Sequence, residues 1–159
     1  MTSMGLRSMK LVLLAEDEYG NAEILRLLLE AEGFRVAPAF NGKEALDLLA
    51  GEKPSVILTD FMMPHVTGGE LGQAVRANPL LEDIPIVVLS GTHESVVRES
   101  FADYDAFVEK PYTADGLLEL VRHLSVNGRP AGNGASPASD PRQDESLQRL
   151  LRGLKIPPA

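Results

Sequence analysis

Five polar side chains stand where short apolar segments of this sequence end. They are Glu16 and Asp17 after LVLLA, Asp60 at the end of SVILTD, Ser90 at the end of IPIVVLS, and Lys110 after AFVE. If these segments are neighbouring parallel strands, the three carboxylates, the hydroxyl and the ammonium meet at one edge of a sheet. Three close carboxylates repel one another unless a cation lies among them, and hard oxygen ligands of this kind suit Mg²⁺.

This set of groups predicts phosphoryl transfer to Asp60. A cation would keep Asp60 ionised and leave one carboxylate oxygen free as the nucleophile. Lys110 and Ser90 would then bind the incoming phosphoryl group, because such transfers depend mainly on positioning and charge neutralisation. Each residue also has a purely structural interpretation. Glu16 and Asp17 could favour the start of a helix, Ser90 could be a turn residue, and Lys110 could be a solvated surface charge.

Apolar segments alternate with helical patterns along the first 125 residues. Strands are predicted within residues 11–15, 34–39, 55–60, 84–91 and 106–111, and helices within 22–33, 41–51, 68–78, 93–102 and 113–124. The alternation predicts an α/β fold with a five-stranded parallel sheet and helices on both faces. Pro38 assigns the second strand to an edge of that sheet, because proline cannot donate to a central ladder.

Helical spacing predicts which side of two helices faces the core. In the first helix, Ile24, Leu27 and Leu28 lie on one face. In the last helix, the apolar face is formed by residues at the same kind of spacing, namely Leu117, Leu120, Val121 and Leu124.

The composition fits one globular domain with its own core. The chain has 159 residues, 44% of them hydrophobic, and no cysteine, which excludes disulfides and thiolate metal sites. A net charge of −8 argues against a nucleic-acid partner. The sequence has no apolar run long enough to span a bilayer and no evident signal peptide, so we expect a cytoplasmic protein with no membrane partner.

Changes in composition divide the chain into four parts. Residues 1–8 form an N-terminal extension, 9–125 the globular domain, 126–145 a flexible linker rich in Gly, Pro and Ser, and 146–156 a short amphipathic helix. That helix has leucines at i, i+3, i+4 and i+7 but is too short to be stable alone. It must dock on the domain, on a second copy or on a partner, or stay disordered.

Four motifs in this order resemble the receiver domain of two-component response regulators. They are AEDE (15–18), LTDFMMP (58–64), VVLSG (87–91) and FVEKP (107–111). The resemblance covers residues 9–125 and is to a stand-alone, single-domain regulator. It implies a doubly wound, flavodoxin-like sheet of order 2-1-3-4-5 flanked by five helices, which agrees with an edge position for Pro38.

The resemblance also implies roles for the acidic residues. Asp60 would accept a phosphoryl group from a histidine kinase or a phosphotransfer protein. Asp17, Asp60 and the backbone carbonyl of Met62 would bind Mg²⁺ directly, and Glu16 would act on the metal through water.

Further roles follow for residues on the last two strands. Ser90 and Lys110 would hold the phosphoryl oxygens, and Phe107 matches the switch aromatic whose rotamer follows the hydroxyl, although core packing alone would also explain its ring. Met62 and Thr92 match positions that line the path of the hydrolytic water. Because Met62 cannot orient a water by hydrogen bonding, slow self-dephosphorylation is predicted.

The resulting expectation is a signalling phosphoacceptor that signals by phosphorylation-dependent protein contact and is not an enzyme with an external substrate. The face of the fourth and fifth strands, or the C-terminal helix, could form a dimer. Three other functions stay open: a phosphorylation-independent interaction module, a Mg²⁺-dependent phosphatase with an aspartyl nucleophile, and a phosphate relay or sink. The interval from Ser90 to Lys110 is about two residues short for the family, which argues against transferring a standard partner surface to this chain.

Overall fold

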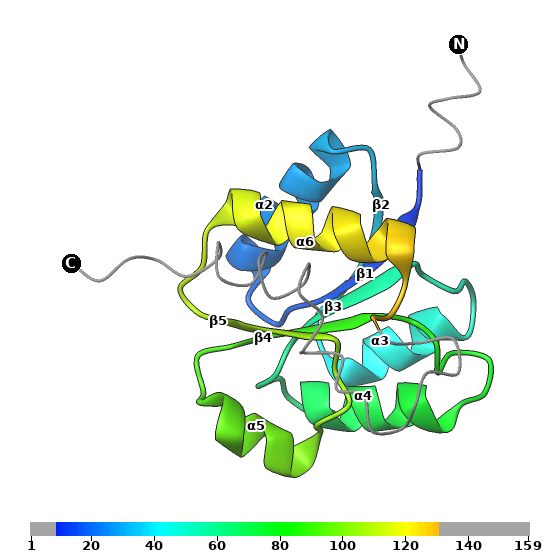
Figure 1. Cartoon of the computed structure of the whole chain (residues 1–159), viewed down its shortest axis with the longest axis vertical. Coiled ribbons are helices and arrows are strands. Elements are labelled where there is room, and N and C mark those ends of the chain that lie inside the picture. The colour runs from blue at the N-terminus through cyan, green and yellow to red at the C-terminus, as the bar shows by residue number, and fades with distance from the viewer. Residues whose placement is uncertain (1–8, 131–159) are drawn as a thin grey trace.

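The computed structural model describes residues 9–130. In this part of the chain five strands alternate with five helices (Figure 1). The elements are β1 (Leu11–Ala15), α2 (Tyr19–Ala31), β2 (Arg35–Ala39), α3 (Gly42–Leu49), β3 (Val56–Asp60), α4 (Gly68–Ala77), β4 (Ile86–Ser90), α5 (Glu94–Ser100), β5 (Ala106–Glu109) and α6 (Ala114–Asn127). The predicted N-terminal extension, the linker from residue 131 onward and the helix 146–156 lie outside the described residues.

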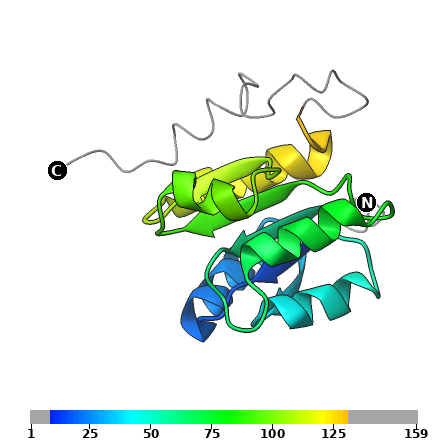
Figure 2. The same cartoon turned by 90° about the horizontal axis from the view of Figure 1, so that it is seen from below.

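The strands form one parallel sheet in the order β2-β1-β3-β4-β5. The predicted fold class is therefore confirmed, and Pro38 lies on the edge strand β2. Helices α2 and α6 cover one face, whereas α3, α4 and α5 cover the other, as Figures 1 and 2 show from two directions. Both faces of the central strands are thus buried, which explains why their sequences are continuously apolar.

Alternate residues of the central strands enter two separate cores. Leu14 and Leu58 face α2 and α6, whereas Leu13 and Ile57 face α3, α4 and α5. Each of these side chains is at most 1% exposed, and burial of such a side chain stabilises the fold by about 1.5–3 kcal/mol. This alternation fixes the register of the strands, because a shift of one residue would exchange the two cores.

The buried faces of the helices were predicted with mixed success. All four predicted apolar residues of α6 are buried. In α2, the core side is formed by Ala22, Leu25 and Leu29. Of the three predicted residues, Leu28 is partly buried against this core, whereas Ile24 and Leu27 are 59% and 55% exposed. The helix contains more leucines than its buried face needs, so spacing alone did not identify the face. The described helix α6 ends at Asn127, whereas the linker was predicted to begin at residue 126.

Candidate functional site

The carboxyl ends of β1, β3, β4 and β5 bring the predicted site residues to one edge of the sheet. Asp60 is the last residue of β3 and is paired with Leu89, while Ser90 ends β4 and is paired with Glu109. Glu16 follows β1 directly, and its backbone N–H donates to Ala39 of the edge strand. The convergence inferred from the strand ends is present in the structure.

Three carboxylates form a compact cluster at this edge. One oxygen each from Glu16, Asp17 and Asp60 lies within 4.8 Å of the others. Glu16 and Asp60 are buried, at 2% and 8% exposure, whereas Asp17 is exposed. The backbone N–H of Glu18 donates to Glu16 Oε2 at 3.1 Å and holds that side chain in place. Oxygen ligands of this number and spacing fit Mg²⁺.

Burial makes the ionised form of two of these acids unfavourable. The pKa of Asp60 is raised by burial, although Lys110 acts in the opposite direction. Burial also raises the pKa of Glu16, against the effect of its hydrogen bond from Glu18. The nearby carboxylates add to both shifts by repulsion. A divalent cation would offset this repulsion and favour the ionised forms, which are the forms of these carboxylates that bind a metal ion.

Lys110 is the cation that the fold itself supplies. Its Nζ lies 3.1 Å from Asp60 Oδ1 and 3.7 Å from Glu16 Oε1. Burial alone would lower the pKa of Lys110, but the hydrogen bond and charge of Asp60 outweigh it and raise that pKa. The backbone N–H of Lys110 donates to the Ser90 carbonyl at 2.9 Å, which ties the ends of β4 and β5 together. Among the described residues, Lys110 is the one cation paired with this cluster of three carboxylates, so the site has an excess of negative charge.

The hydroxyl of Ser90 is held by the loop that follows β4. Ser90 is 1% exposed, and its Oγ accepts a hydrogen bond of 2.8 Å from the backbone N–H of Thr92. Thr92 therefore contacts Ser90 through its backbone, and its side chain takes no part in this bond.

The turn after Asp60 packs closely against the end of β3. The Phe61 N–H donates to Asp60 Oδ1 at 3.2 Å, and the Gly68 N–H donates to the Phe61 carbonyl at 2.8 Å. A Cβ on Gly68 would lie 2.3 Å from the Asp60 carbonyl oxygen, so only glycine permits this approach. The side chain of Met62 is 63% exposed beside this turn.

Phe107 lies on β5 opposite Val88 and is partly buried. Its ring centroid is 5.9 Å from that of Tyr104, and the Tyr104 hydroxyl donates to Glu94 at the start of α5. Phe107 is thus connected through Tyr104 to α5. The ring packs against the core and is linked through Tyr104 to α5, so its position is compatible with both interpretations of its role.

Sequence reasoning missed two contributors to this site. Tyr112, two residues after Lys110, is partly buried, and burial together with Glu16 and Asp60 raises the pKa of its hydroxyl against the effect of Lys110. Tyr104 links Phe107 to α5 and is 1% exposed. A tyrosine directly after the lysine–proline pair was a visible signal for the first, whereas no local pattern indicated the second.

The sequence as a whole matches a known family. A family model described as the response regulator receiver domain matches residues 12–122. The chain belongs to the response regulator receiver family. It is thus a receiver domain of two-component signalling, and the resemblance seen in the four motifs is confirmed.

Relatives of the receiver domain include longer proteins. The chain is 32% identical over 145 residues to the response regulator MprA of Mycolicibacterium vanbaalenii, covering 89% of this chain and 61% of MprA. It is 33% identical over 121 residues to the phosphate regulon transcriptional regulatory protein PhoB of Rhizobium meliloti, covering 75% of this chain and 53% of PhoB. The chain therefore spans less than two thirds of the length of either relative.

Solved structures agree with this assignment. The response regulator TrrA of Thermotoga maritima, solved in complex with Mg²⁺ and BeF, is 29% identical to this chain. The match has a TM-score of 0.66 and covers 73% of this chain and 99% of TrrA. Across the described helices of the present chain, none combines the length and the hydropathy of a membrane-spanning segment.

Proposed function

We propose that this receiver accepts a phosphoryl group on Asp60 and signals by phosphorylation-dependent protein contact. The observation that carries the proposal is the cluster of Glu16, Asp17 and Asp60 within 4.8 Å of one another, with Lys110 3.1 Å from Asp60. Asp17, Asp60 and the carbonyl of Met62 would hold Mg²⁺, and Glu16 would act on it through water. When bound, the ion offsets the charge of the acids and of the phosphoryl oxygens.

The two oxygens of Asp60 have different surroundings. Lys110 and the N–H of Phe61 both contact Oδ1. We therefore assign the other oxygen, Oδ2, to bond formation. It would attack the phosphorus of a phosphohistidine; the new O–P bond forms as the P–N bond breaks, and the histidine nitrogen keeps the electron pair and takes up a proton.

Two side chains beside Asp60 would receive the transferred group. The Lys110 ammonium can exchange its contact with Asp60 for one with a phosphoryl oxygen, and Ser90 can donate its hydroxyl hydrogen to another. Movement of Ser90 would disturb the loop held by its bond to Thr92, and the pair Phe107–Tyr104 connects that region with α5. The face of β4, β5 and α5 would therefore differ between the two states.

Partners follow from this chemistry. The donor would be a sensor histidine kinase or a phosphotransfer protein, and the receiver of the signal a downstream protein, in the cytoplasm. We also propose that the chain acts as a stand-alone receiver and has no nucleic-acid partner. The relative PhoB differs in this respect, since it is a transcriptional regulatory protein and the match spans only 53% of it.

The decisive experiment is phosphorylation with acetyl phosphate followed by intact-protein mass spectrometry. We expect the mass of one phosphoryl group to be gained in the presence of Mg²⁺ and lost with a chelator. Asp60→Asn should not be modified, whereas Asp47→Asn, which removes an exposed acid on α3, should behave like the wild type. Equal modification of Asp60→Asn would contradict the assignment of the acceptor.

Met62 is proposed to set the lifetime of the phosphoryl group. Its thioether is 63% exposed beside the site and is a poor hydrogen-bond partner for water. Met62→Asn should release phosphate faster than the wild type, because an amide can orient the attacking water. Thr92→Asn tests the other position assigned to this path. Loss of the phosphoryl mass over time gives both rates, and unchanged rates in both variants would refute this role.

A further inference from the structure

A second charged cluster lies at the opposite edge of the sheet from Asp60. Asp105 directly precedes β5 and is fully buried, and its Oδ2 accepts a hydrogen bond of 2.7 Å from the N–H of Ile86 at the start of β4. The Asp105 N–H donates back to the Ile86 carbonyl at 2.9 Å. Asp105 therefore joins the first residues of the two strands that carry Ser90 and Phe107.

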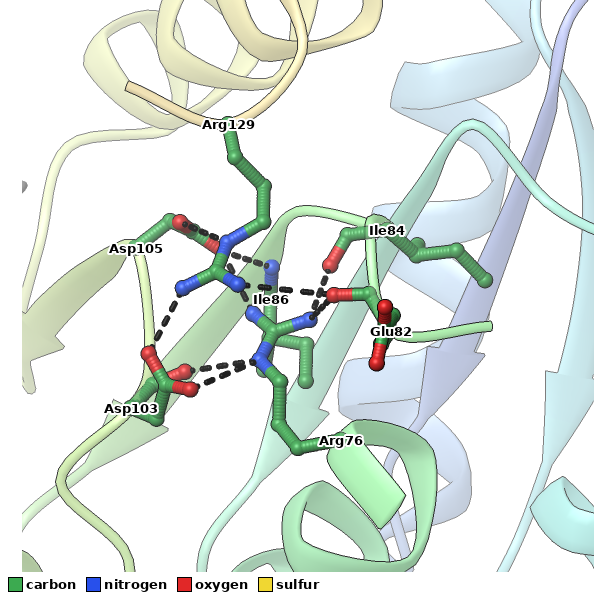
Figure 3. Close-up of polar contacts among 7 residues, drawn as sticks. All are labelled: Arg76, Glu82, Ile84, Ile86, Asp103, Asp105 and Arg129. Carbon is green, nitrogen blue, oxygen red and sulfur yellow. Dashed lines mark hydrogen bonds and ion pairs between the residues drawn. The ribbon is translucent and has the colours of Figure 1, made fainter. Parts of the chain in front are cut away.

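Two arginines meet on the Asp105 carboxylate (Figure 3). Arg76 Nη2 donates to Oδ2 at 2.8 Å, and Arg129 Nε donates to Oδ1 at 2.8 Å. Figure 3 shows Arg76 extending from α4, on one face of the sheet, and Arg129 from the end of α6, on the other. With the hydrogen bond from Ile86, both carboxylate oxygens are satisfied.

Arg76 is committed to this position by further bonds. Its Nη1 donates to the carbonyls of Glu82 and Ile84 at 2.9 and 2.7 Å, and its Nε donates to the Asp103 carbonyl at 3.0 Å. Its side chain is 10% exposed. Arg76 is thus held in place by several bonds. Its ion pair with Asp105 is buried and does not depend on Arg129.

Arg129 lies outside the helix that precedes it. Helix α6 ends at Asn127, and Gly128 takes a φ of +72° that turns the chain, a conformation that favours glycine. Arg129 then reaches Asp105 and also donates through Nη2 to Asp103 Oδ1 at 2.6 Å, and Pro130 after it is buried. The guanidinium fork matches two carboxylates at once, which a lysine could not do.

We propose that Asp105, Asp103 and Arg76 form an exit anchor, which fixes Arg129 and Pro130, where the described part of the chain ends, to the first residues of β4 and β5. Because β4 and β5 end at the paired residues Ser90 and Glu109 beside the site of Asp60, the exit moves together with these strands when Asp60 is phosphorylated. This link between phosphorylation and the exit rests on the proposed function.

Distance measurements between two spin labels test the anchor. The chain has no cysteine, so labels can be placed by Lys43→Cys on α3 and Ala131→Cys directly after the anchor. With Arg129 present, pulsed electron spin resonance should give one narrow distance distribution. Arg129→Met should broaden it at least twofold. The matched control is Arg122→Met, which removes an arginine of α6 that pairs with Glu32 at the surface, and it should leave the width unchanged.

A milder variant covers the case in which Arg129→Met fails to fold. Asp103 is 58% exposed in its side chain, and Asp103→Asn removes one acid of the anchor while the buried ion pairs of Asp105 remain. It should broaden the distribution less than Arg129→Met but more than Arg122→Met. A distribution as narrow as that of Arg122→Met in both anchor variants would overturn the anchor.

The same labels test the link to phosphorylation. Beryllofluoride with Mg²⁺ should shift the mean distance when Arg129 is present and should not shift it in Arg129→Met. Acetyl phosphate labelling, followed by mass, reports separately whether Asp60 is modified. If Asp60 is modified and the mean distance does not shift, the proposed link between phosphorylation and the exit is wrong. The anchor is then judged only from the widths of the distance distributions. If Asp60 is not modified, both the proposed function and the link to phosphorylation are wrong. The widths of the distance distributions without beryllofluoride still test the anchor.

Discussion

Removal of the Asp60 charge should make the metal-free protein more stable. Asp60 is buried next to Glu16 and Asp17, and burial and repulsion raise its pKa. The fold therefore holds this carboxylate in a place where the ionised form is unfavourable. Asp60→Asn keeps the shape of the side chain and removes the charge, so the strain of the site is relieved without a cavity.

The structure gives the size of the effect. At an effective dielectric constant of about 20, the contact of 3.1 Å with Lys110 contributes an attraction of roughly 5 kcal/mol. On the same scale the repulsion from a neighbouring carboxylate at 4.8 Å is roughly 3.5 kcal/mol, which is smaller than the Lys110 attraction, and solvent screening at the exposed Asp17 reduces it further. Burial of Asp60 is the largest contribution to its raised pKa and outweighs the attraction by Lys110, so the ionised form is unfavourable in the metal-free protein. We expect Asp60→Asn to raise the free energy of unfolding by about 1–2 kcal/mol.

Thermal unfolding in a chelating buffer measures this difference. The melting temperature should rise by roughly 2–8 °C in Asp60→Asn. Addition of Mg²⁺ at 100 times its Kd should stabilise the wild type by about 2.7 kcal/mol and the variant much less, which narrows or reverses the difference. Asp47→Asn controls for the change in net charge. An Asp60→Asn protein that is no more stable than the wild type would show that the Lys110 pair outweighs the cost of burying the Asp60 charge, and would refute the prediction.

Three further predictions concern the site and its support. Burial raises the pKa values of Asp60 and Glu16, so protons should displace Mg²⁺ at a higher pH than in an exposed carboxylate site. The affinity for Mg²⁺, measured by titration calorimetry, should therefore begin to fall on acidification well above a pH of about 4. A constant affinity for Mg²⁺ down to that pH would contradict this prediction. Gly72→Ala places a Cβ 2.4 Å from a ring carbon of Phe101 and should destabilise the fold by about 1–3 kcal/mol in urea unfolding. Its matched control, Gly20→Ala in α2, meets open space and should stabilise by roughly 0.5–1 kcal/mol; equal effects of the two would refute the packing argument.

The sequence was sufficient for the fold and for the edge that holds the acids. Continuous apolar runs identify central parallel strands, and Pro38 identifies the edge strand β2. Once the strands are placed, residues at their carboxyl ends must meet, so Asp60, Ser90 and Lys110 needed no long-range information. The buried face of α2 was missed, because Ile24 and Leu25 are both apolar and only the packing against β1 decides between them.

The exit anchor could not be read from the sequence. Asp105 stands in the stretch FADYDAF, which has no motif of its own, and Arg129 stands in a stretch that composition assigns to a linker. Their bond joins residues 24 positions apart, and that of Asp105 with Arg76 joins residues 29 positions apart. Such contacts depend on where the ends of α4 and α6 lie relative to the sheet. Local sequence patterns do not predict these positions.

The two edges of the sheet differ in one decisive respect. At the anchor, two arginines face two aspartates, and the Asp105 carboxylate is satisfied by three donors. At the other edge, three carboxylates face Lys110 alone among the described residues. A buried cluster with balanced charge is complete and holds the strands together, whereas a buried cluster with excess negative charge is stable only when it recruits a cation. The same strands β4 and β5 are therefore tied to each other at one end and open to chemistry at the other. A phosphoryl group at Asp60 would act on strands whose far ends move together with the exit anchor.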